Sequence, residues 1–389
     1  MCEGGGGMKL QLGVLFGGAS VEHEISIISA IQAMNHLDQD RYHVIPIYIA
    51  KDHQLYHSSM LTDVKNFRDL DQLCAKLTPV AFYRKGNQCV LKSSSLFHKD
   101  IVIDLVLPIM HGTFGEDGTL QGYLRMLKIP FCACELSAAV LGQDKELMKQ
   151  ILEAHQLPIV PWFAVEKNKL DEASLIKQCD EIGWPLIIKP ASLGSSVGIH
   201  VAATVDQLNE GLADAFQYDS HVVIEHAVTQ MREFNCALIG DEEEVTLSCI
   251  EEVLKGDEIL SYKDKYEGNG KSKGIVSTGR KIPADLSIEQ QEIIEILARK
   301  AFHALRGFGI ARIDFLMDSD TQDIYINEIN TIPGSLSFYL FEPKGIAFAQ
   351  LLDQLIQLTL KRQRKQAQMI CSYATNVLSA YSGGSKMIK

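Results

Sequence analysis

The stretches Ile310-Ala-Arg-Ile-Asp-Phe-Leu-Met317 and Tyr325-Ile-Asn-Glu-Ile-Asn330 read as strands, and the turn-rich stretch Asp318-Ser-Asp-Thr-Gln-Asp323 lies between them. This order predicts a β-hairpin. A register centred on Thr321 places Asp314 opposite Glu328 and Arg312 opposite Asn330, and period 2 keeps each pair of side chains on one face of its strand. Two carboxylates and an amide oxygen suit Mg²⁺ bridging phosphates, with an arginine nearby to hold negative charge. The other interpretation is an exposed hairpin with a salt bridge.

Strands and helices alternate in the first third of the chain. We expect a strand at Leu10–Phe16, a helix from about Glu22 to Leu37, a strand at Val44–Ile49 and a nearly all-apolar strand at Ile101–Ile109. Strand, crossover helix and strand together predict a doubly wound α/β unit, in which ligands bind beyond the carboxyl ends of the strands.

Polar, glycine-rich segments follow three of the predicted strands. Residues 17–24 and 111–118 come after two strands of the first third, and Gly194-Ser-Ser-Val-Gly198 comes after a predicted strand at Trp184–Pro190, which contains Lys189. Backbone N–H groups of such a loop close over phosphates, and Lys189 would add a point charge. A plain loop before a helix is the alternative for residues 194–198, and a buried structural histidine is the alternative for His111.

Further elements divide the rest of the chain. Ser137 is the expected N-cap of a helix that runs to about Ala154, Val222–Glu225 is an expected strand, and Ser287-Ile-Glu-Gln290 forms a capping box at the start of another helix. We place an N-terminal domain at 8–135, a central domain at 136–228, a C-terminal domain at 229–366 and a tail at 367–389.

Composition restricts the class of protein. The 389 residues suffice for two to three domains, and 46% hydrophobic with 22% charged residues is typical of a folded globular chain. Acidic residues exceed basic ones (49 against 37), which disfavours nucleic acid and anionic membranes as partners. The nine cysteines are scattered without metal-ligand spacing, no long apolar run predicts a membrane span, and the first seven residues lack a signal-peptide pattern. We expect a reduced, cytoplasmic protein.

The polar clusters, taken in order, resemble those of the D-alanine–D-alanine ligase family of the ATP-grasp superfamily. The resemblance covers about residues 9 to 360 and rests on seven motifs, Gly17-Gly-x-Ser20-x-Glu22-x-Glu24-x-Ser26, His111-Gly-x-x-Gly-Glu-Asp-Gly-x-x-Gln121-Gly122, Asp144-Lys145, Lys189-Pro-x-x-x-Gly-Ser-Ser-Val-Gly198, Lys265-Tyr266, Arg312-Ile-Asp314 and Asn327-Glu-x-Asn330-Thr-x-Pro-Gly334. It implies an ATP-grasp fold, in which a doubly wound α/β domain precedes two α+β domains that sandwich ATP.

The resemblance also implies a role for each matching residue. ATP would be bound by Lys145, Lys189, Ser195, Ser196, Glu225, Glu233 and Lys265. The amino-acid substrates would be met by Glu22, His111, Arg312, Gly334 and Tyr339, and the catalytic set would be Glu22, Ser195, Arg312, Tyr266 and His111. Two Mg²⁺ ions, for which Mn²⁺ would substitute, would be held by Asp314, Glu328 and Asn330.

The implied reaction joins two D-alanines through a D-alanyl phosphate, in the cytoplasmic synthesis of peptidoglycan precursors by a homodimer. The run from Ser335 to Pro343 departs from the family, because Tyr339 stands where a serine usually contacts the acceptor. A D-Ala–D-Ser ligase, or another D-Ala–D-X ligase, is therefore an alternative. Another ATP-grasp carboxylate–amine ligase and a non-catalytic nucleotide-binding paralogue are further alternatives, and the complete set of lysines, arginine and metal ligands disfavours the last.

Overall fold

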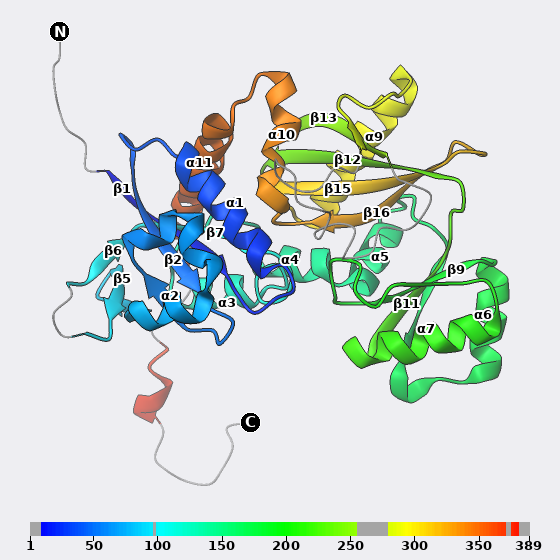
Figure 1. Ribbon diagram of the computed structural model, residues 1–389, viewed down its shortest axis with the longest axis horizontal. Helices are drawn as coiled ribbons and strands as arrows, with labels where there is room; N and C mark the ends of the chain where they lie inside the picture. The colour runs from blue at the N-terminus through cyan, green and yellow to red at the C-terminus, as the bar shows by residue number, and fades with distance from the viewer. Residues whose placement is uncertain (1–8, 96–98, 255–278, 371–374, 381–389) are drawn as a thin grey trace.

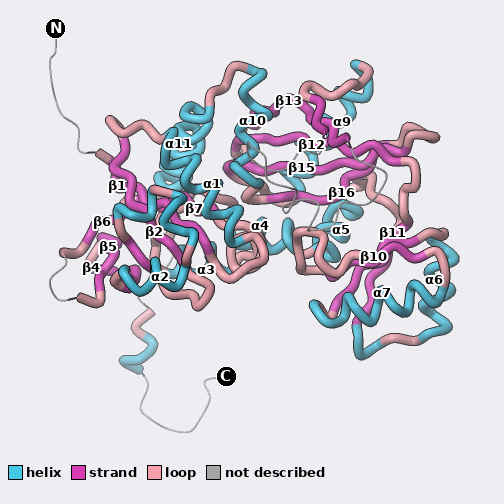
Figure 2. Tube along the Cα trace, in the orientation of Figure 1, coloured by secondary structure: helices cyan, strands magenta, loops and turns pink. Residues whose placement is uncertain are grey.

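The computed structural model describes residues 9–95, 99–254, 279–370 and 375–380. These residues form three β-sheets, which follow one another along the chain and occupy three regions of the molecule (Figure 1). The tube in Figure 2 shows that helices pack around each of them. The limits that we expect for the three domains remain a prediction.

The N-terminal sheet has the strand order β6-β5-β4-β3-β2-β1-β7. Its strands are β1 (Leu10–Gly17), β2 (Tyr42–Ile49), β3 (Leu55–His57), β4 (Pro79–Lys85), β5 (Gln88–Ser93), β6 (Ile101–Ile103) and β7 (Leu105–Ile109). Strand β1 pairs in parallel with both β2 and β7, and helix α1 (His23–His36) makes the crossover from β1 to β2. The predicted doubly wound unit is confirmed in this part of the sheet.

The prediction of a single strand at 101–109 is wrong. Strand β6 pairs with β5, whereas β7 pairs with β1 at the other edge of the sheet, and the two strands separate at Asp104. Asp104 binds Gln11 twice: its carboxylate accepts the N–H of Gln11 at 2.8 Å, and its own N–H donates to the carbonyl of Gln11 at 2.9 Å. A polar residue in an otherwise apolar run here marks a change of pairing partner.

The central sheet has the order β10-β9-β11-β8, and helices α6 and α7 pack against it. Its elements are β8 (Trp162–Glu166), α6 (Glu172–Ile182), β9 (Leu186–Pro190), β10 (His200–Ala202), α7 (Val205–Tyr218) and β11 (His221–His226). The strands expected around Lys189 and Glu225 are thereby confirmed. Lys189 and Glu225 lie on the neighbouring strands β9 and β11.

The single helix expected from Ser137 to Ala154 is also wrong. Helix α4 (Leu136–Gln143), with Glu135 at its N-cap position, ends before a second helix, α5 (Lys145–Ala154). Asp144 separates them because its side chain accepts the N–H of Leu147 at 3.0 Å and so caps α5. Lys145 therefore starts a helix rather than lying inside one.

The C-terminal sheet has the order β14-β13-β12-β15-β16. Its strands are β12 (Met231–Gly240), β13 (Val245–Leu254), β14 (Gly279–Lys281), β15 (Gly309–Asp318) and β16 (Ile324–Asn330). The predicted hairpin is confirmed, because Arg312 pairs with Asn330 and Asp314 pairs with Glu328. The register then shifts by one residue at Asn327, which forms a bulge that the sequence pattern did not predict.

The two faces of this sheet differ in polarity. Helix α9 (Ile288–Ala304) covers the apolar face, and the predicted capping box of Ser287 and Gln290 begins that helix. The other face carries a row of polar residues from four neighbouring strands, Glu251, Asn235, Asp314 and Glu328. This face borders the candidate site.

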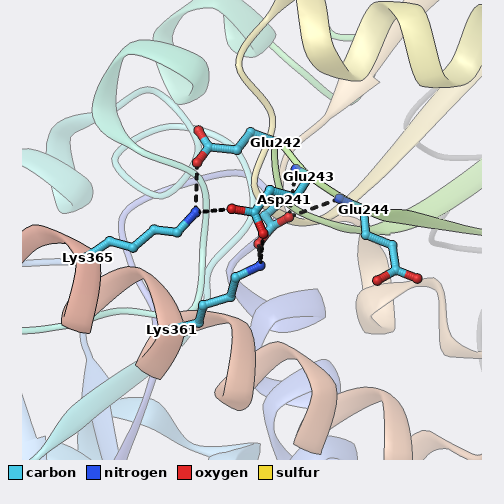
Figure 3. Close-up of polar contacts among 6 residues, drawn as sticks. All are labelled: Asp241, Glu242, Glu243, Glu244, Lys361 and Lys365. Atoms are coloured by element: carbon cyan, nitrogen blue, oxygen red, sulfur yellow. Dashed lines mark hydrogen bonds and ion pairs between the residues drawn. The ribbon is translucent and has the colours of Figure 1, made fainter.

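Helix α11 (Phe348–Ala367) links the N-terminal sheet to the C-terminal one, since its buried leucines belong to the same core as strand β1. Figure 3 shows Lys361 and Lys365 of α11 at the β12–β13 turn, where they pair with the acidic residues Asp241, Glu242 and Glu243. The remaining helical segments are η1 (Ser59–Thr62), η2 (Val64–Arg68), α2 (Leu70–Lys76), α3 (Thr119–Met126), η3 (Lys167–Lys169), η4 (Gly334–Ser337), α10 (Phe338–Phe341), η5 (Glu342–Lys344) and η6 (Val377–Ala380).

Two expectations from composition can be compared with the described ranges. The cysteines found there are all free thiols, and Cys132 and Cys134 are buried, as predicted. None of the helices in those ranges combines the length and the apolar character that a membrane span needs.

Candidate active site

The loop after β9 meets the loop after β1 through one hydrogen bond. The Ser195 hydroxyl donates to the Glu22 carboxylate with an Oγ–Oε1 distance of 2.5 Å. Gly112, after β7, approaches the same carboxylate so closely that an added Cβ would lie 2.7 Å from Oε2 of Glu22, and its φ of +70° also favours glycine. Ser20 donates to the carbonyl oxygen of His111 at 2.8 Å. Three segments far apart in sequence therefore converge on Glu22.

His111 and Glu116 together hold the backbone of Ile332. The Nδ1 of His111 donates to the carbonyl of Ile332 at 2.8 Å, and the Glu116 carboxylate accepts the N–H of Ile332 at 2.8 Å and that of Gly112 at 2.9 Å. Gly334 follows two residues later, and an added Cβ there would meet no atom within 4 Å. The contact fixes a backbone segment that borders open space.

Burial is the largest influence on the pKa values of His111 and Glu116. It lowers the pKa of His111, although the charge of Glu22 opposes the shift. It raises the pKa of Glu116 to about 8, where Glu22 adds to the rise and the two backbone donors oppose it. At neutral pH a neutral imidazole with its proton on Nδ1 accounts for the contact with Ile332.

Three lysines, two from helix α5 and one from strand β9, lie near Glu225 of the central sheet. Lys189 and Lys149 both pair with Glu225, at 2.7 Å and 3.1 Å, and the Lys145 ammonium donates to the carbonyl of Leu193 at 2.5 Å. Burial alone would raise the pKa of Glu225, but Lys149 and Lys189 outweigh it and hold that pKa at about 2. Burial lowers the pKa of both Lys145 and Lys149; the charges of Glu328 and Glu225 oppose this shift at Lys145, and the charge of Glu225 opposes it at Lys149. The lysines near the loop 194–198 therefore interact with carboxylates of both the central and the C-terminal sheet.

The polar face of the C-terminal sheet carries a tightly paired arginine. Arg312 donates to both oxygens of Asp314, at 2.6 Å and 2.7 Å, and the amide of Asn330 donates to Asp314 at 3.1 Å. Burial lowers the pKa of Arg312, but Asp314 outweighs burial, and Tyr339 and Glu328 act in the same direction, so the net shift is upward. Arg312 is therefore a permanent cation beside the polar row.

The carboxylates of this face exceed its cations. Burial raises the pKa of Asp314, Arg312 opposes this, and the charges of Glu328 and Glu233 add to the rise. A divalent cation would offset that excess, and the oxygens of Asp314, Glu328 and Asn330 are the donor types that Mg²⁺ prefers. The described residues contain no cluster of three or more His, Cys, Asp or Glu side chains that could hold a metal ion by itself.

The structure places the predicted residues in three groups. Glu22, Ser195 and His111 lie at the junction of the loops, with Ser196 beside Ser195 at a φ of +58°. Lys145, Lys189 and Glu225 lie around the central sheet, and Arg312, Asp314, Glu328, Asn330 and Glu233 lie on the polar face. Tyr339 binds Glu251 of the polar row at 3.0 Å. Lys265 and Tyr266 lie outside the described residues. The role of each residue stays a prediction.

Sequence reasoning missed several members of the site. Lys149 follows Lys145 by four residues, so a helical repeat could have placed both on one face of α5. Glu116 belongs to the His111 motif but received no role there. Asn327 is the bulge residue whose amide oxygen accepts a hydrogen bond from Lys189 at 3.4 Å. Nothing in the local sequence marks Glu251 or Arg280, which the sheet brings to Tyr339.

Known proteins match almost the whole chain. Residues 11–134 match the family model described as D-ala D-ala ligase N-terminus, and residues 151–357 match D-ala D-ala ligase C-terminus. The D-alanine–D-alanine ligase of Thermosipho melanesiensis is 34% identical, and the alignment covers 96% of this chain and 99% of that one.

Solved structures of ligases also resemble this chain. The D-alanine–D-alanine ligase from Coxiella burnetii superposes with a TM-score of 0.78 at 28% identity, covering 92% of this chain and 98% of that one. The VanG D-Ala:D-Ser ligase from Enterococcus faecalis gives a TM-score of 0.75 at 27% identity, covering 90% of this chain and all of that one (100%). The fold is therefore the expected ATP-grasp arrangement, and the chain belongs to the D-alanine–D-alanine ligase family.

Proposed function

We propose that the protein joins two D-alanines to D-Ala-D-Ala and converts ATP to ADP and phosphate in the same reaction. The observation that carries the proposal is the Ser195–Glu22 hydrogen bond. It joins the glycine-rich loop after β9, which would close over the phosphates of ATP, to the carboxylate that would bind an amino-acid ammonium group. One site thus offers cationic and backbone donors for phosphates beside an acceptor for an amine. A ligase that transfers a phosphoryl group to an amino-acid carboxylate needs both.

A carboxylate does not react with an amine because oxide is a prohibitively poor leaving group. In the proposed reaction the γ-phosphoryl group of ATP is transferred to the first D-alanine, and the resulting acylphosphate is attacked by the amine of the second. The tetrahedral intermediate then expels phosphate. Positioning and charge stabilisation supply most of the catalysis, so the protein acts chiefly by holding the reactants.

Each group of residues has a place in this reaction. Glu22 pairs with the ammonium of the first D-alanine, and Lys145 and Lys189 bind phosphates of ATP. Arg312 stabilises the oxyanion, and the backbone N–H of Gly334, fixed through Ile332, orients the substrates. Bound Mg²⁺, held by Asp314, Glu328 and Asn330, would neutralise phosphate charge.

We further propose that the reaction serves peptidoglycan precursor synthesis in the cytoplasm, in a homodimer, and that 8–135, 136–228 and 229–366 are the three domains. D-Serine as the second substrate is the alternative. The likeness to VanG, a D-Ala:D-Ser ligase, and Tyr339 at the expected acceptor position support it.

The test is phosphate release from ATP and Mg²⁺ with D-alanine alone, D-alanine plus D-serine, D-alanine plus D-lactate, and a panel of L-amino acids, with products identified by mass. D-Ala-D-Ala from D-alanine alone is the expected result. Product formed only with D-serine would move the specificity to the alternative. Absence of turnover with every D-amino acid would refute the proposed function.

A further inference from the structure

The Tyr339 side chain is fixed on the polar face by a buried carboxylate. Its hydroxyl donates to Oε2 of Glu251 at 3.0 Å, and the amide of Asn235 donates to the same oxygen at 3.1 Å. Glu251 is only 1% exposed, so this anchor is internal to the protein. Burial and the charge of Glu251 raise the pKa of Tyr339, and the charge of Arg312 opposes that rise.

A second arginine lies on the same ring. The guanidinium carbon of Arg280, on β14, is 5.1 Å from the centroid of Tyr339, within the range of a cation–π contact. Its Nε lies 3.2 Å from Oε1 of Glu251, and 34% of its side chain is exposed. Glu251 therefore holds both Tyr339 and Arg280, one on each carboxylate oxygen.

The two arginines differ in how they are used. Arg312 donates two parallel hydrogen bonds, from Nε and Nη2, to the carboxylate of Asp314, at 2.6 Å and 2.7 Å. Within the described residues, the ion pair of Arg280 with Glu251 is made by its Nε, and a guanidinium carries four more N–H groups on its two Nη nitrogens, in a geometry that suits a planar carboxylate. Of the two, Arg280 is the better donor to a further anion.

We propose that Arg280, stacked on Tyr339, binds the α-carboxylate of the second amino acid. The inference rests on the proposed function, because the acceptor must present its amine to the acylphosphate while its own carboxylate is held elsewhere. The polar face carries Asp314, Glu328 and Glu233, whose charges repel that carboxylate, so a dedicated cation is needed. Glu251 is a positioning residue that keeps Tyr339 and Arg280 together.

The experiment compares Arg280→Gln and Arg280→Lys with wild type, using D-alanine and D-alaninamide as acceptors with D-alanine as donor. D-alaninamide has the amine but no carboxylate. We expect Arg280→Gln to raise the KM of acceptor D-alanine at least tenfold and to leave the KM of D-alaninamide and of ATP within twofold. Arg280→Lys should recover part of the loss because it keeps the charge.

Lys281→Gln is the matched control. Lys281 is the next residue of β14, and it pairs with Asp285 at 2.9 Å rather than with Glu251. The preference of the Lys281→Gln variant for D-alanine over D-alaninamide should equal that of wild type. An unchanged preference for D-alanine over D-alaninamide in Arg280→Gln, with the thermal midpoint preserved, would overturn the assignment of Arg280 while leaving the proposed function intact. Absence of any dipeptide from the wild-type enzyme would overturn the function and the acceptor site together.

Discussion

Glu328 tests the magnesium assignment at the scale of one residue. It pairs with Asp314 across the hairpin, and its charge contributes to the raised pKa of that carboxyl. Glu328→Gln removes one negative charge without removing core volume. We expect turnover to be largely abolished, the Mg²⁺ concentration for half-maximal activity to rise, and the thermal midpoint to stay near that of wild type. Near-normal activity at low Mg²⁺ would contradict the assignment.

Lys149 is a fully buried cation whose only ionic partner among the described residues is Glu225, at 3.1 Å. Burial lowers the pKa of Lys149, and Glu225 opposes that shift. Lys149→Met removes one of the two cations that pair with Glu225, and Lys189 still pairs with that carboxylate, so the free energy of unfolding should fall by less than the roughly 3 kcal/mol that a fully unpaired buried charge costs. Urea denaturation measures this.

A double-mutant cycle separates the pair from lost packing. Lys149→Met combined with Glu225→Gln should cost less than the sum of the two single changes, because Glu225→Gln leaves the buried Lys149 without a counter-charge only while Lys149 is present. Strict additivity would show that Lys149 contributes only through its volume.

Glu116 predicts a pH dependence of stability. Its pKa in the folded protein is about 8 against an ordinary value of 4.5, so the folded state binds the proton more tightly between these values. Stability from this group is fully present below about pH 4.5 and is lost as the pH rises through about 8. Relative to Glu116→Gln, wild type should lose stability between about pH 5 and pH 8, by roughly 1 kcal/mol for each pH unit within this range. Parallel unfolding profiles would contradict the raised pKa.

Residue types and spacing identified the members of the site that carry their own motif. His111 and Arg312 were found in this way because one lies at the end and the other in the register of a predicted strand, whereas the family resemblance singled out Glu22 within the polar segment 17–24. Glu251 and Lys149 were not, because their significance comes from Tyr339 and Glu225, which lie 88 and 76 positions away in sequence. A buried partner so distant leaves no local signal.

At the scale of the element, the turn between β16 and α10 has a strained backbone. Ser335, Leu336 and Ser337 have φ values of 49°, 51° and 48°, a left-handed conformation that costs about 1–2 kcal/mol for each non-glycine residue. Ser335 is compensated, because its N–H donates to Ser29 at 3.0 Å and its hydroxyl to Gln32 at 2.7 Å. Helix α1 therefore holds the segment that carries Gly334.

Ser337→Gly should stabilise the protein by about 1 kcal/mol. The residue is fully buried, and its hydroxyl has no hydrogen-bond partner within the described part of the chain. Glycine removes both the backbone strain and the unsatisfied hydroxyl, and these gains exceed the extra entropy of the unfolded chain. Ser335→Gly is the control, since it relieves similar strain but loses the bond to Gln32; it should not stabilise. Equal thermal midpoints for both variants would contradict the argument.

Element types were predictable where one physical signal dominated. The hairpin at 310–330 follows from alternation and a turn, and the start of α9 follows from its capping box. The failures come from single aspartates that act through hydrogen bonds: Asp104 redirects a strand, and Asp144 ends one helix and caps the next. In the sequence, each aspartate only interrupts an apolar pattern. The pattern does not show which backbone N–H groups the carboxylate will accept hydrogen bonds from, and those bonds decide where the strand or helix ends.

At the scale of the whole molecule, the loop after β16 and helix α11 bind the C-terminal sheet to the N-terminal one. Ile332, Leu336 and Leu340 lie in the same core as the leucines of β1, although more than 300 residues separate them in sequence. Sequence pattern assigned these segments to the C-terminal domain and gave no hint that they complete the N-terminal core. Local sequence patterns cannot predict these contacts, because the contacts form only when helices and strands distant in sequence pack against each other.

Arg362 of α11 tests how much this connection contributes. Its guanidinium donates to the carbonyl oxygens of Ala133 at 2.8 Å and Phe131 at 2.5 Å, and its carbon lies 3.7 Å from the ring centroid of Phe308. Arg362→Met would leave two carbonyls without their donor and remove the cation–π contact. We expect the free energy of unfolding to fall by about 3 kcal/mol, measured in urea. Lys365→Gln, which breaks the exposed pairs with Glu242 and Glu243 in Figure 3, is the matched control and should leave the midpoint unchanged, because exposed ion pairs add little. Equal losses in both variants would show that the surface clamp, and not the buried arginine, joins α11 to the rest of the protein.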